Sequence, residues 1–374
     1  MKKNIIIVAL ATLLAVSCDS YLDRQPDEPY TSKNVFEKYN STFRYLVNVY
    51  SWIINETDPS GQTNNYEPSS DECVCVFTGR SFAQWNNSTW AVNTEDQGGT
   101  GYFSYYTTYY KGIREESYFS ANVGRCPELS PSEVTEWSAE ARFLRAFYYF
   151  NLVECWGDVP FKTVSTQSVT NLNIPRTDKQ EIYDFIVSEM ADAAETGLKS
   201  AADLAYKPGR ISQSTAWGIL ARVYLFRAGE HYREDRNATQ AEKKDYFERA
   251  SFYAQKVMTA GHKLAANYWD PFCDMWSDKY NTTANESIWE AEFAGNNISD
   301  TQAEGRIGNI IGLAGPYMSS KSDVVGSKDP GYAYAFIYST PKLYNLYVNN
   351  GDTKRFNWSI TPFEYKEAGG KNTG

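Results

Sequence analysis

Residues 130–161, SPSEVTEWSAEARFLRAFYYFNLVECWGDVPF, decide the fold of this chain. Ser130 can cap a helix, and Pro131 suits the first helical position. Glu133 stands three residues after Ser130, which is the spacing of a capping box. Gly157 closes the run, because a glycine commonly follows the last residue of a helix. The pattern predicts one long helix between Ser130 and Gly157.

Apolar side chains fall on two nearly opposite faces of this helix when residues are spaced at about 100° each. One face carries Ala139, Phe143, Ala146, Phe147, Phe150 and Val153, and the other carries Trp137, Leu144, Tyr148 and Leu152. The flanks carry Glu136, Glu140 and Glu154 on one side and Arg142, Arg145 and Tyr149 on the other. A surface helix needs only one apolar stripe, so two faces predict a helix packed between neighbours in a helical array.

Apolar residues at helical spacing predict further helices on both sides of this one. Their ranges are about 35–54, 100–124, 177–190, 212–228, 243–260 and 340–349. At the start of the third range, Thr177 and Gln180 stand at capping-box spacing. Paired helices of this length, with alanines where they cross, resemble tetratricopeptide hairpins, although no strict repeat is visible.

Two long segments lack helical periodicity. The first, 55–99, is polar but contains many aromatic residues, which favours a functional loop over a disordered one. The second, 267–300, is also loop-like and aromatic. Within it, Ser287 to Phe293 alternates polar and apolar residues, which predicts a short strand.

The composition excludes some classes of function. A formal net charge of −10 argues against nucleic acid as a partner, because phosphate binding needs a basic surface. His231 and His262 are the only histidines, and neither has a second His or a Cys at ligand spacing. We therefore expect no transition-metal site and no cofactor. Aromatic residues make up 16% of the chain, and we expect some rings to face solvent or a ligand.

The first residues predict a targeting signal. A basic start, Lys2 and Lys3, precedes an apolar run at 5–16 that is too short to span a bilayer. A small residue then precedes Cys18, which is typical of a bacterial lipoprotein cleavage site. The alternative is an ordinary secretory signal with an incidental cysteine. We expect lipidation of Cys18, which would anchor the protein in a membrane.

These observations predict a simple organisation. Residues 1–17 form a lipoprotein signal peptide, 18–34 a polar tether, and 35–374 a single α-helical domain whose tetratricopeptide-like helices lie mainly within 130–261. The cysteines beyond Cys18 are Cys73, Cys75, Cys126, Cys155 and Cys273. Their number is odd, and we expect no disulfide framework. Cys155, at the end of the long helix, is expected to be a small core residue.

Four landmarks in order carry a family resemblance. They are the lipoprotein-type start, AEARFLRAFYYFNLVECWGDVPF at 139–161, IPRTDKQEIYDFIVSEM at 174–190, and GRISQSTAWGILARVYLFRAG at 209–229. With them the chain resembles the SusD/RagB family of Bacteroidetes outer-membrane lipoproteins over nearly its whole length. Members commonly run well past the length of this chain, so it looks short at its C-terminus.

The resemblance implies a fold and a function. The fold is mainly α, with a tetratricopeptide-like helical scaffold and long irregular ligand-binding loops. The implied function is a cell-surface, outer-membrane lipoprotein that binds a glycan and delivers it to a SusC-type TonB-dependent transporter. Some relatives take up peptides or other nutrients, and that alternative stays open here.

The resemblance also indicates where a ligand would bind. The starch-binding member uses an Asp, an Arg, a Trp and an Asn from the corresponding N-terminal region. Asp71, Arg80, Trp90 and Asn93 occur here in that order at similar spacing. Flat rings stack on sugar faces, whereas Asp, Asn and Arg hold hydroxyl groups, so these residue types suit a glycan.

Two further candidates, Trp276 and Tyr317, come from the later loop region that the family also uses for ligand contacts. The alternative for each aromatic residue is that it anchors a loop on the helices. Loops are the most variable part of this family, so the identity of the glycan does not carry over.

Two other functions remain open. A helical carbohydrate-active enzyme would need two carboxylates facing each other across a cleft. Asp71 and Glu72 are adjacent, and adjacent residues of a strand point opposite ways, so they do not make such a pair. The other alternative is a transporter-associated scaffold with no glycan ligand of its own. We expect binding without catalysis.

Overall fold

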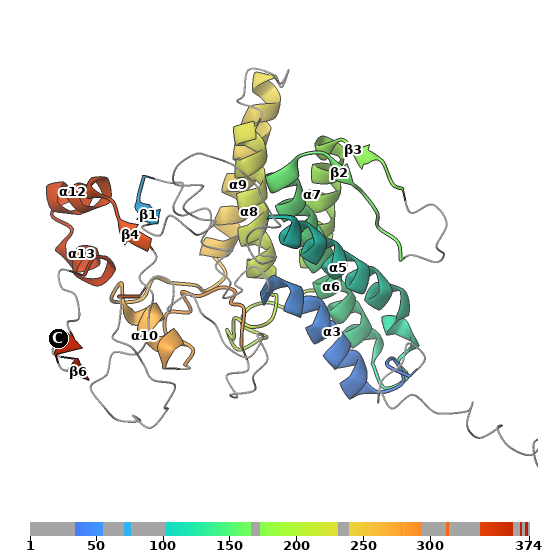
Figure 1. Cartoon of the computed structure of the whole chain (residues 1–374). Helices are drawn as coiled ribbons and strands as arrows, with labels where there is room; N and C mark the ends of the chain where they lie inside the picture. Colours follow the sequence, from blue (N-terminus) through green and yellow to red (C-terminus); the bar gives the residue numbers. More distant parts are fainter. Residues whose placement is uncertain are drawn as a thin grey trace, which may run out of the picture.

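The structure is a computed structural model. It describes residues 34–54, 71–75, 102–165, 173–230, 239–277, 279–293, 312–313, 337–361, 367–368 and 371–372. Within these ranges the protein is mainly α-helical (Figure 1). The helices are α3 (Tyr39–Ile54), α5 (Tyr102–Asn122), α6 (Pro131–Trp156), α7 (Lys179–Thr196), α8 (Gln213–Glu230), α9 (Gln240–Met258), α10 (Asp270–Trp276), α12 (Pro341–Asn350) and α13 (Thr353–Ser359), with a 3-10 turn, η4, at Val123–Arg125.

Short antiparallel ladders connect pairs of strands, and one of them joins segments that lie far apart in the sequence. They pair β1 (Cys73–Cys75) with β4 (Ile337–Ser339), β2 (Val159–Pro160) with β3 (Arg176–Thr177), and β5 (Glu367–Ala368) with β6 (Lys371–Asn372). In the first ladder Cys73 lies opposite Ser339. This pairing holds a segment from the first half of the chain against the helices near its end.

The long helix α6 begins and ends as its sequence predicts. The Ser130 hydroxyl accepts a hydrogen bond from the Glu133 backbone N–H, and the Glu133 carboxylate accepts one from the Ser130 N–H at 2.8 Å. At the other end Gly157 has a φ of +69°, a conformation that favours glycine. Its N–H donates to the Val153 carbonyl at 3.0 Å and closes the last turn.

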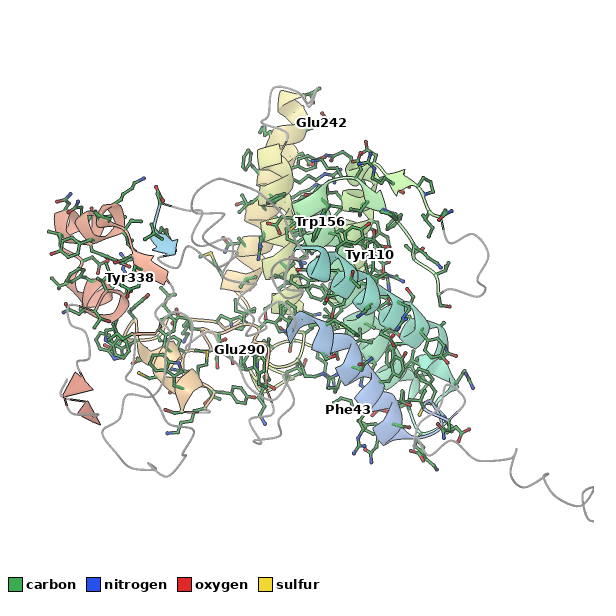
Figure 2. The ribbon with its side chains drawn as sticks, viewed as in Figure 1. Phe43, Tyr110, Trp156, Glu242, Glu290 and Tyr338 are labelled. Atoms are coloured by element: carbon green, nitrogen blue, oxygen red, sulfur yellow. The ribbon has the colours of Figure 1, made fainter. Side chains whose placement is uncertain are left out.

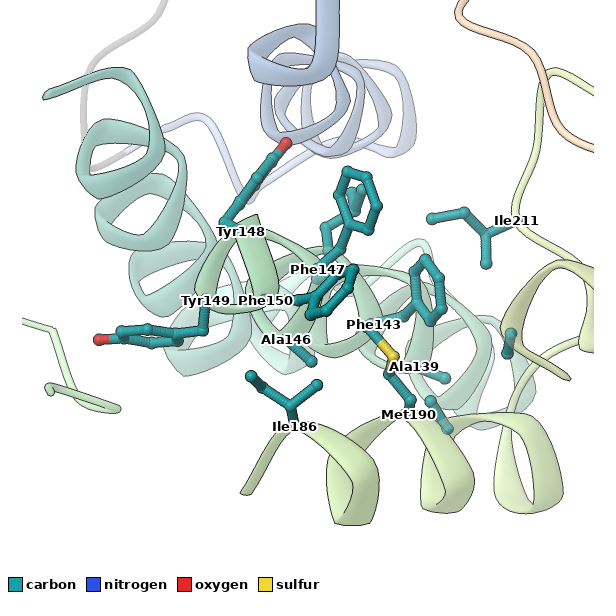
Figure 3. Close-up of a cluster of buried hydrophobic side chains, with 14 of the residues drawn as sticks. Ala139, Phe143, Ala146, Phe147, Tyr148, Tyr149, Phe150, Ile186, Met190 and Ile211 are labelled. Atoms are coloured by element: carbon teal, nitrogen blue, oxygen red, sulfur yellow. The ribbon is translucent and has the colours of Figure 1, made fainter. Parts of the chain in front are cut away.

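α6 lies at the centre of the core and is buried nearly all round (Figure 3). Both predicted apolar faces are buried. Tyr148 points toward α3, where its hydroxyl donates to the Val49 carbonyl at 2.6 Å. Ile186 and Met190 of α7 approach from another side. Part of each charged flank is buried as well: Glu136, Glu140 and Arg145 are at most 8% exposed. The other two charged residues of the flanks, Arg142 and Glu154, are partly exposed.

Consecutive helices pack against one another from α3 to α9, with α5, α6, α7 and α8 between them (Figure 1). At the crossing of α5 and α6, a Cβ atom on Gly112 would lie 2.7 Å from the Tyr148 ring, so only glycine allows this approach. Stacking of each helix on its sequence neighbours is the packing of a tetratricopeptide-like scaffold. The predicted fold class is confirmed.

The predicted capping box at Thr177 and Gln180 is wrong. α7 begins at Lys179, and its N-cap is Asp178, whose carboxylate accepts a hydrogen bond from the Gln180 N–H at 2.7 Å. Thr177 lies in β3 instead. Both Thr and Asp are good N-caps, so sequence spacing alone could not choose between neighbours.

Three other local predictions are also wrong. Ser287 to Phe293 forms no strand, although the Glu290 N–H donates to the Pro208 carbonyl at 3.0 Å. Trp276 ends the helix α10 and does not lie in an irregular loop. Cys155 is exposed, because it lies on the side of the last turn of α6 that faces away from the core.

α10, α12 and α13 are short helices outside the array (Figure 1). α12 has Thr340 as its N-cap, whose hydroxyl accepts from the Leu343 N–H at 3.2 Å, and it ends at Gly351 with a φ of +63°. Asp352 then caps α13 by accepting from the Arg355 N–H at 3.2 Å. None of the helices in the described part of the chain has the length and apolarity that a bilayer crossing requires.

Candidate functional site

Asp71 lies two residues before the first residue of β1 and is hydrogen-bonded to the start of α12. Its carbonyl accepts a hydrogen bond from the Thr340 hydroxyl at 2.5 Å, and the Glu72 carbonyl accepts one from the Thr340 N–H at 2.9 Å. Its carboxylate pairs with the Lys342 ammonium, which lowers the pKa of Asp71. Both side chains of this pair remain largely exposed. Asp71 is therefore an ionised acceptor on an open surface.

Aromatic contacts connect α12 to α13. The Phe356 ring of α13 lies 5.4 Å from the Tyr344 ring and 6.2 Å from the Tyr347 ring of α12, measured between centroids. Such edge-to-face pairs stabilise helix contacts beyond the area they bury.

A second aromatic contact connects α13 to α10. The Trp269 and Trp358 rings stack with centroids 5.6 Å apart and planes 12° apart. The Tyr268 and Ser359 hydroxyls lie 3.4 Å apart beside this stack. Together β1, β4, α10, α12 and α13 form a unit that we call the aromatic module. It carries both Asp71 and Trp276.

Exposed rings follow one side of α10. Phe272 and Trp276 are four residues apart on α10, which places them on one side of the helix, and Tyr268 lies in the turn just before the helix begins. The Tyr268 and Phe272 rings have centroids 5.5 Å apart. Trp276 is 71% exposed, and the other two are about 40% exposed. A row of open rings of this kind offers flat apolar faces to a ligand in solvent.

The structure thus brings two of the predicted site residues, Asp71 and Trp276, onto one module. The other four, Arg80, Trp90, Asn93 and Tyr317, lie outside the described residues, as does Cys18. Tyr268 and Phe272 were not predicted. Their spacing relative to Trp276 was the available signal, and it was missed because segment 267–300 was interpreted as loop.

A cavity of about 440 Å³ lies elsewhere, beside the helical array. We call it the α3 cavity. One wall is α3, which contributes Phe43, Val47 and Tyr50, and the other is formed by residues 207–210 and 289–292. Figure 2 labels one residue of each wall, Phe43 and Glu290. Sequence reasoning did not find this cavity, because its walls come from three distant segments.

A buried network of polar groups supports one side of the α3 cavity. The Arg210 guanidinium donates to the Glu140 carboxylate with an Nε–Oε2 distance of 2.9 Å, and also lies 3.2 Å from Glu136. The Tyr50 hydroxyl donates to Glu140 and accepts from the Ile211 N–H at 3.1 Å. Burial raises the pKa of Glu140, and Arg210 opposes this shift. The network fixes the positions of Tyr50 and Arg210 in the cavity wall.

A serine and a histidine lie close enough to suggest a nucleophile and its base. The His262 Nε2 is 2.8 Å from the Ser214 hydroxyl, and its Nδ1 is 2.6 Å from the Asn285 carbonyl. Ser214, however, is 1% exposed and also lies 3.0 Å from the Ser212 hydroxyl. A substrate cannot reach it there, so the pair holds the 262 and 285 segments against α8. Elsewhere among the described residues, no cluster of His, Cys, Asp and Glu has the arrangement of a metal site.

Comparisons with known proteins agree with this fold. A family model described as "Starch-binding associating with outer membrane", SusD-like, matches residues 20–225. A SusD-like protein of Bacteroides ovatus is 26% identical over 284 residues, which cover 73% of this chain and 47% of that protein. The chain spans about half the length of the curated relatives it matches.

Solved structures show the same fold at low sequence identity. A SusD homologue from Bacteroides thetaiotaomicron is 21% identical with a TM-score of 0.68, covering 93% of this chain and 62% of that one. A laminarin-binding SusD-like protein is 22% identical with a TM-score of 0.63, covering 84% of this chain and 65% of that one. The helical scaffold is therefore shared with these proteins.

Proposed function

The chain belongs to the SusD-like family of starch-binding proteins that associate with the outer membrane, and on this premise we propose that it binds a glycan without cleaving it. One observation carries the proposal: Phe272 and Trp276 present exposed rings four residues apart on α10, and the exposed Tyr268 ring lies beside Phe272 just before this helix. Pyranose rings have apolar faces that stack on aromatic side chains, and their hydroxyls bond to nearby polar groups. The laminarin-binding relative supports a glucan as one candidate ligand.

Asp71 supplies the polar partner on the same module. An ionised carboxylate accepts strong hydrogen bonds from hydroxyl groups. We propose that Arg80, Trp90, Asn93 and Tyr317 complete the site with Asp71 and Trp276, as the family pattern implies. A long glycan could then stack on several rings at once, which raises affinity without a deep pocket.

Binding without catalysis is proposed because the family description names binding, and because the Ser214 hydroxyl that faces His262 is only 1% exposed and out of reach of a substrate. The test combines two measurements on the purified protein. Migration through native gels containing starch, laminarin, xyloglucan or polygalacturonate reports binding, and a reducing-sugar assay of the same polysaccharides reports cleavage. Retardation without new reducing ends is expected. Free migration in all gels would contradict the proposal, as would sustained release of reducing ends.

We further propose that the protein acts at the outer membrane with a SusC-type TonB-dependent transporter. The family description supports association with the outer membrane. In this proposal residues 1–17 are a signal peptide, Cys18 carries the lipid, 18–34 is a tether, and 35–374 is one domain. Labelling with a palmitate analogue checks the anchor: Cys18→Ser should abolish incorporation, whereas Cys273→Ser should not. Co-purification of the transporter from membranes checks the partnership.

A further inference from the structure

The α3 cavity has the size and lining of a small-molecule site. Ligand sites in proteins typically enclose several hundred Å³ and are mostly apolar, with a few polar groups that fix orientation. The α3 cavity, at about 440 Å³, is lined largely by apolar side chains, with Trp289 and Phe43 among them. Trp289 is itself held in place, because its ring lies 5.3 Å from Phe147 and 5.8 Å from Phe143 of α6. The cavity therefore has an aromatic wall fixed to the core.

Among the described residues, some charged side chains that line this cavity form ion pairs, and others do not. Arg210 is neutralised by Glu140, to which it donates two hydrogen bonds. Glu290 and Glu292 also line the cavity, and within the described part of the chain neither forms an ion pair. Glu292 accepts a hydrogen bond from the Tyr280 hydroxyl, and Lys207 is the remaining cation of the lining. The cavity thus offers two carboxylates as acceptors for a ligand.

These acceptors point to a class of ligand. A carboxylate forms charge-assisted hydrogen bonds with hydroxyl donors. It repels another carboxylate or a sulfate, and the net charge of −10 adds to that repulsion over the whole molecule. A sugar unit that carries hydroxyls but no negative charge satisfies both the carboxylates and the aromatic wall.

We propose that the α3 cavity is a second glycan-binding site, which takes an uncharged sugar unit and rejects an acidic one. This rests on the proposed function, because it assumes that glycans are the ligands of the protein. Trp289 and Phe43 contact the apolar face of the sugar, and Glu290 and Glu292 accept hydrogen bonds from its hydroxyls. The Tyr50–Glu140–Arg210 network holds the cavity open before binding, which reduces the ordering cost on association.

Gly209 lies next to the carboxylate of Glu292. A Cβ atom on Gly209 would lie 2.3 Å from this carboxylate, which is the end of a flexible side chain and can move aside. The contact places Glu292 beside the 207–210 segment in the cavity wall.

The test measures affinity and stoichiometry by isothermal titration of the purified protein with maltohexaose, laminarihexaose and hexagalacturonate. Val47→Trp fills the cavity from α3 at a position that is 49% exposed, and Leu225→Trp is its matched control, 52% exposed on α8. Glu290→Gln removes one charge and keeps the side-chain shape. Thermal unfolding confirms that each variant is folded, and Trp276→Ala reports the aromatic module independently.

The wild-type protein should bind a neutral hexasaccharide at two sites, and the second of these should bind hexagalacturonate at least tenfold more weakly. Val47→Trp should abolish binding at the α3 cavity and keep the other site. Glu290→Gln should weaken binding at the α3 cavity about tenfold, because it removes a charge-assisted hydrogen bond. Leu225→Trp should keep both sites. If the wild type binds and Val47→Trp retains both sites and their affinities, the cavity proposal fails while the proposed function stands. Equal binding of hexagalacturonate at the second site, the one that Val47→Trp removes, overturns the selection of uncharged sugars. If none of the three oligosaccharides binds, the cavity proposal fails. The proposed function fails as well only if the protein also migrates freely through every polysaccharide gel.

Discussion

Arg210 donates two hydrogen bonds to the carboxylate of Glu140, which lies on α6 with only 2% of its side chain exposed. The two residues are separated by 70 positions in the sequence. Tyr50 joins the same carboxylate from α3. One buried group therefore connects α3, α6 and the segment that precedes α8, and it supports the wall of the α3 cavity.

Arg210→Ala should destabilise the protein by about 3–5 kcal/mol, because it leaves the buried Glu140 without its counter-charge. Urea denaturation followed by circular dichroism measures the loss. Arg249→Ala is the control, since Arg249 pairs with Asp245 on an exposed helix surface and should cost less than about 1 kcal/mol. Equal costs for the two variants would show that the Glu140 pair does not organise the core.

Glu116 predicts a pH dependence. Burial raises the pKa of Glu116 to about 7 from the usual 4.5, against the attraction of Arg145. Between these values the unfolded chain has lost this proton while the folded protein keeps it. The contribution of Glu116 to stability is therefore complete below pH 4.5 and declines, by up to about 3 kcal/mol, as the pH rises to 7.

Glu116→Gln cannot titrate, so its stability relative to wild type should rise between pH 4.5 and 7 and then level off. Urea denaturation over this pH range measures the difference. Glu128→Gln is a control of opposite sign, because the Tyr39 N–H lowers the pKa of Glu128 and any contribution of this group is lost as the pH falls. Parallel profiles for wild type and Glu116→Gln would contradict the expected role of burial.

Gly112→Ala tests the close crossing of α5 and α6. The added methyl group would lie 2.7 Å from the Tyr148 ring and 3.2 Å from Trp52, so we expect a loss of about 1–3 kcal/mol from overpacking. Gly218→Ala is the matched helical control, because the nearest atom lies 3.9 Å away and alanine favours a helix by about 0.5–1 kcal/mol. Opposite changes in melting temperature are expected. A stabilising Gly112→Ala would show that the two helices can move apart freely.

Trp276→Ala should weaken binding of the retained glycan by about 1–2 kcal/mol, a five- to thirtyfold loss, because it removes an exposed stacking ring. Its melting temperature should be nearly unchanged. Met258→Ala is the control. Met258 is 72% exposed, which matches the 71% exposure of Trp276, but it lies at the end of α9 and outside the aromatic module. Titration calorimetry of both variants distinguishes a specific contact from general loss of apolar surface. Equal affinities in all three proteins would move the site away from α10.

The sequence was sufficient to predict α6, because its capping box, its period and its final glycine are all local signals. It could not show that Glu140 is buried, since that depends on Arg210, which lies in another segment. The start of α7 was misplaced by one residue because Thr177 and Asp178 are both suitable caps. Local patterns thus predicted the longer helices, whereas α10, α13 and the pairing between distant polar residues required the structure.

The candidate site shows the same division. The family resemblance predicted Asp71 and Trp276 as site residues, but their sharing of one module depends on contacts through Lys342, Phe356 and the Trp269–Trp358 stack. The α3 cavity could not be predicted from the sequence, because its walls come from segments that are distant in the chain. The alternation at 287–293 predicted a strand, whereas residues 289–292 form part of one wall.

Isothermal titration of a neutral glycan that the gels retain, followed by analysis of its length, tests the central claim most directly. The account predicts saturable binding to the wild-type protein, weaker binding to Trp276→Ala, and a glycan recovered at its original length. A shortened glycan, or the absence of saturable binding, would contradict it.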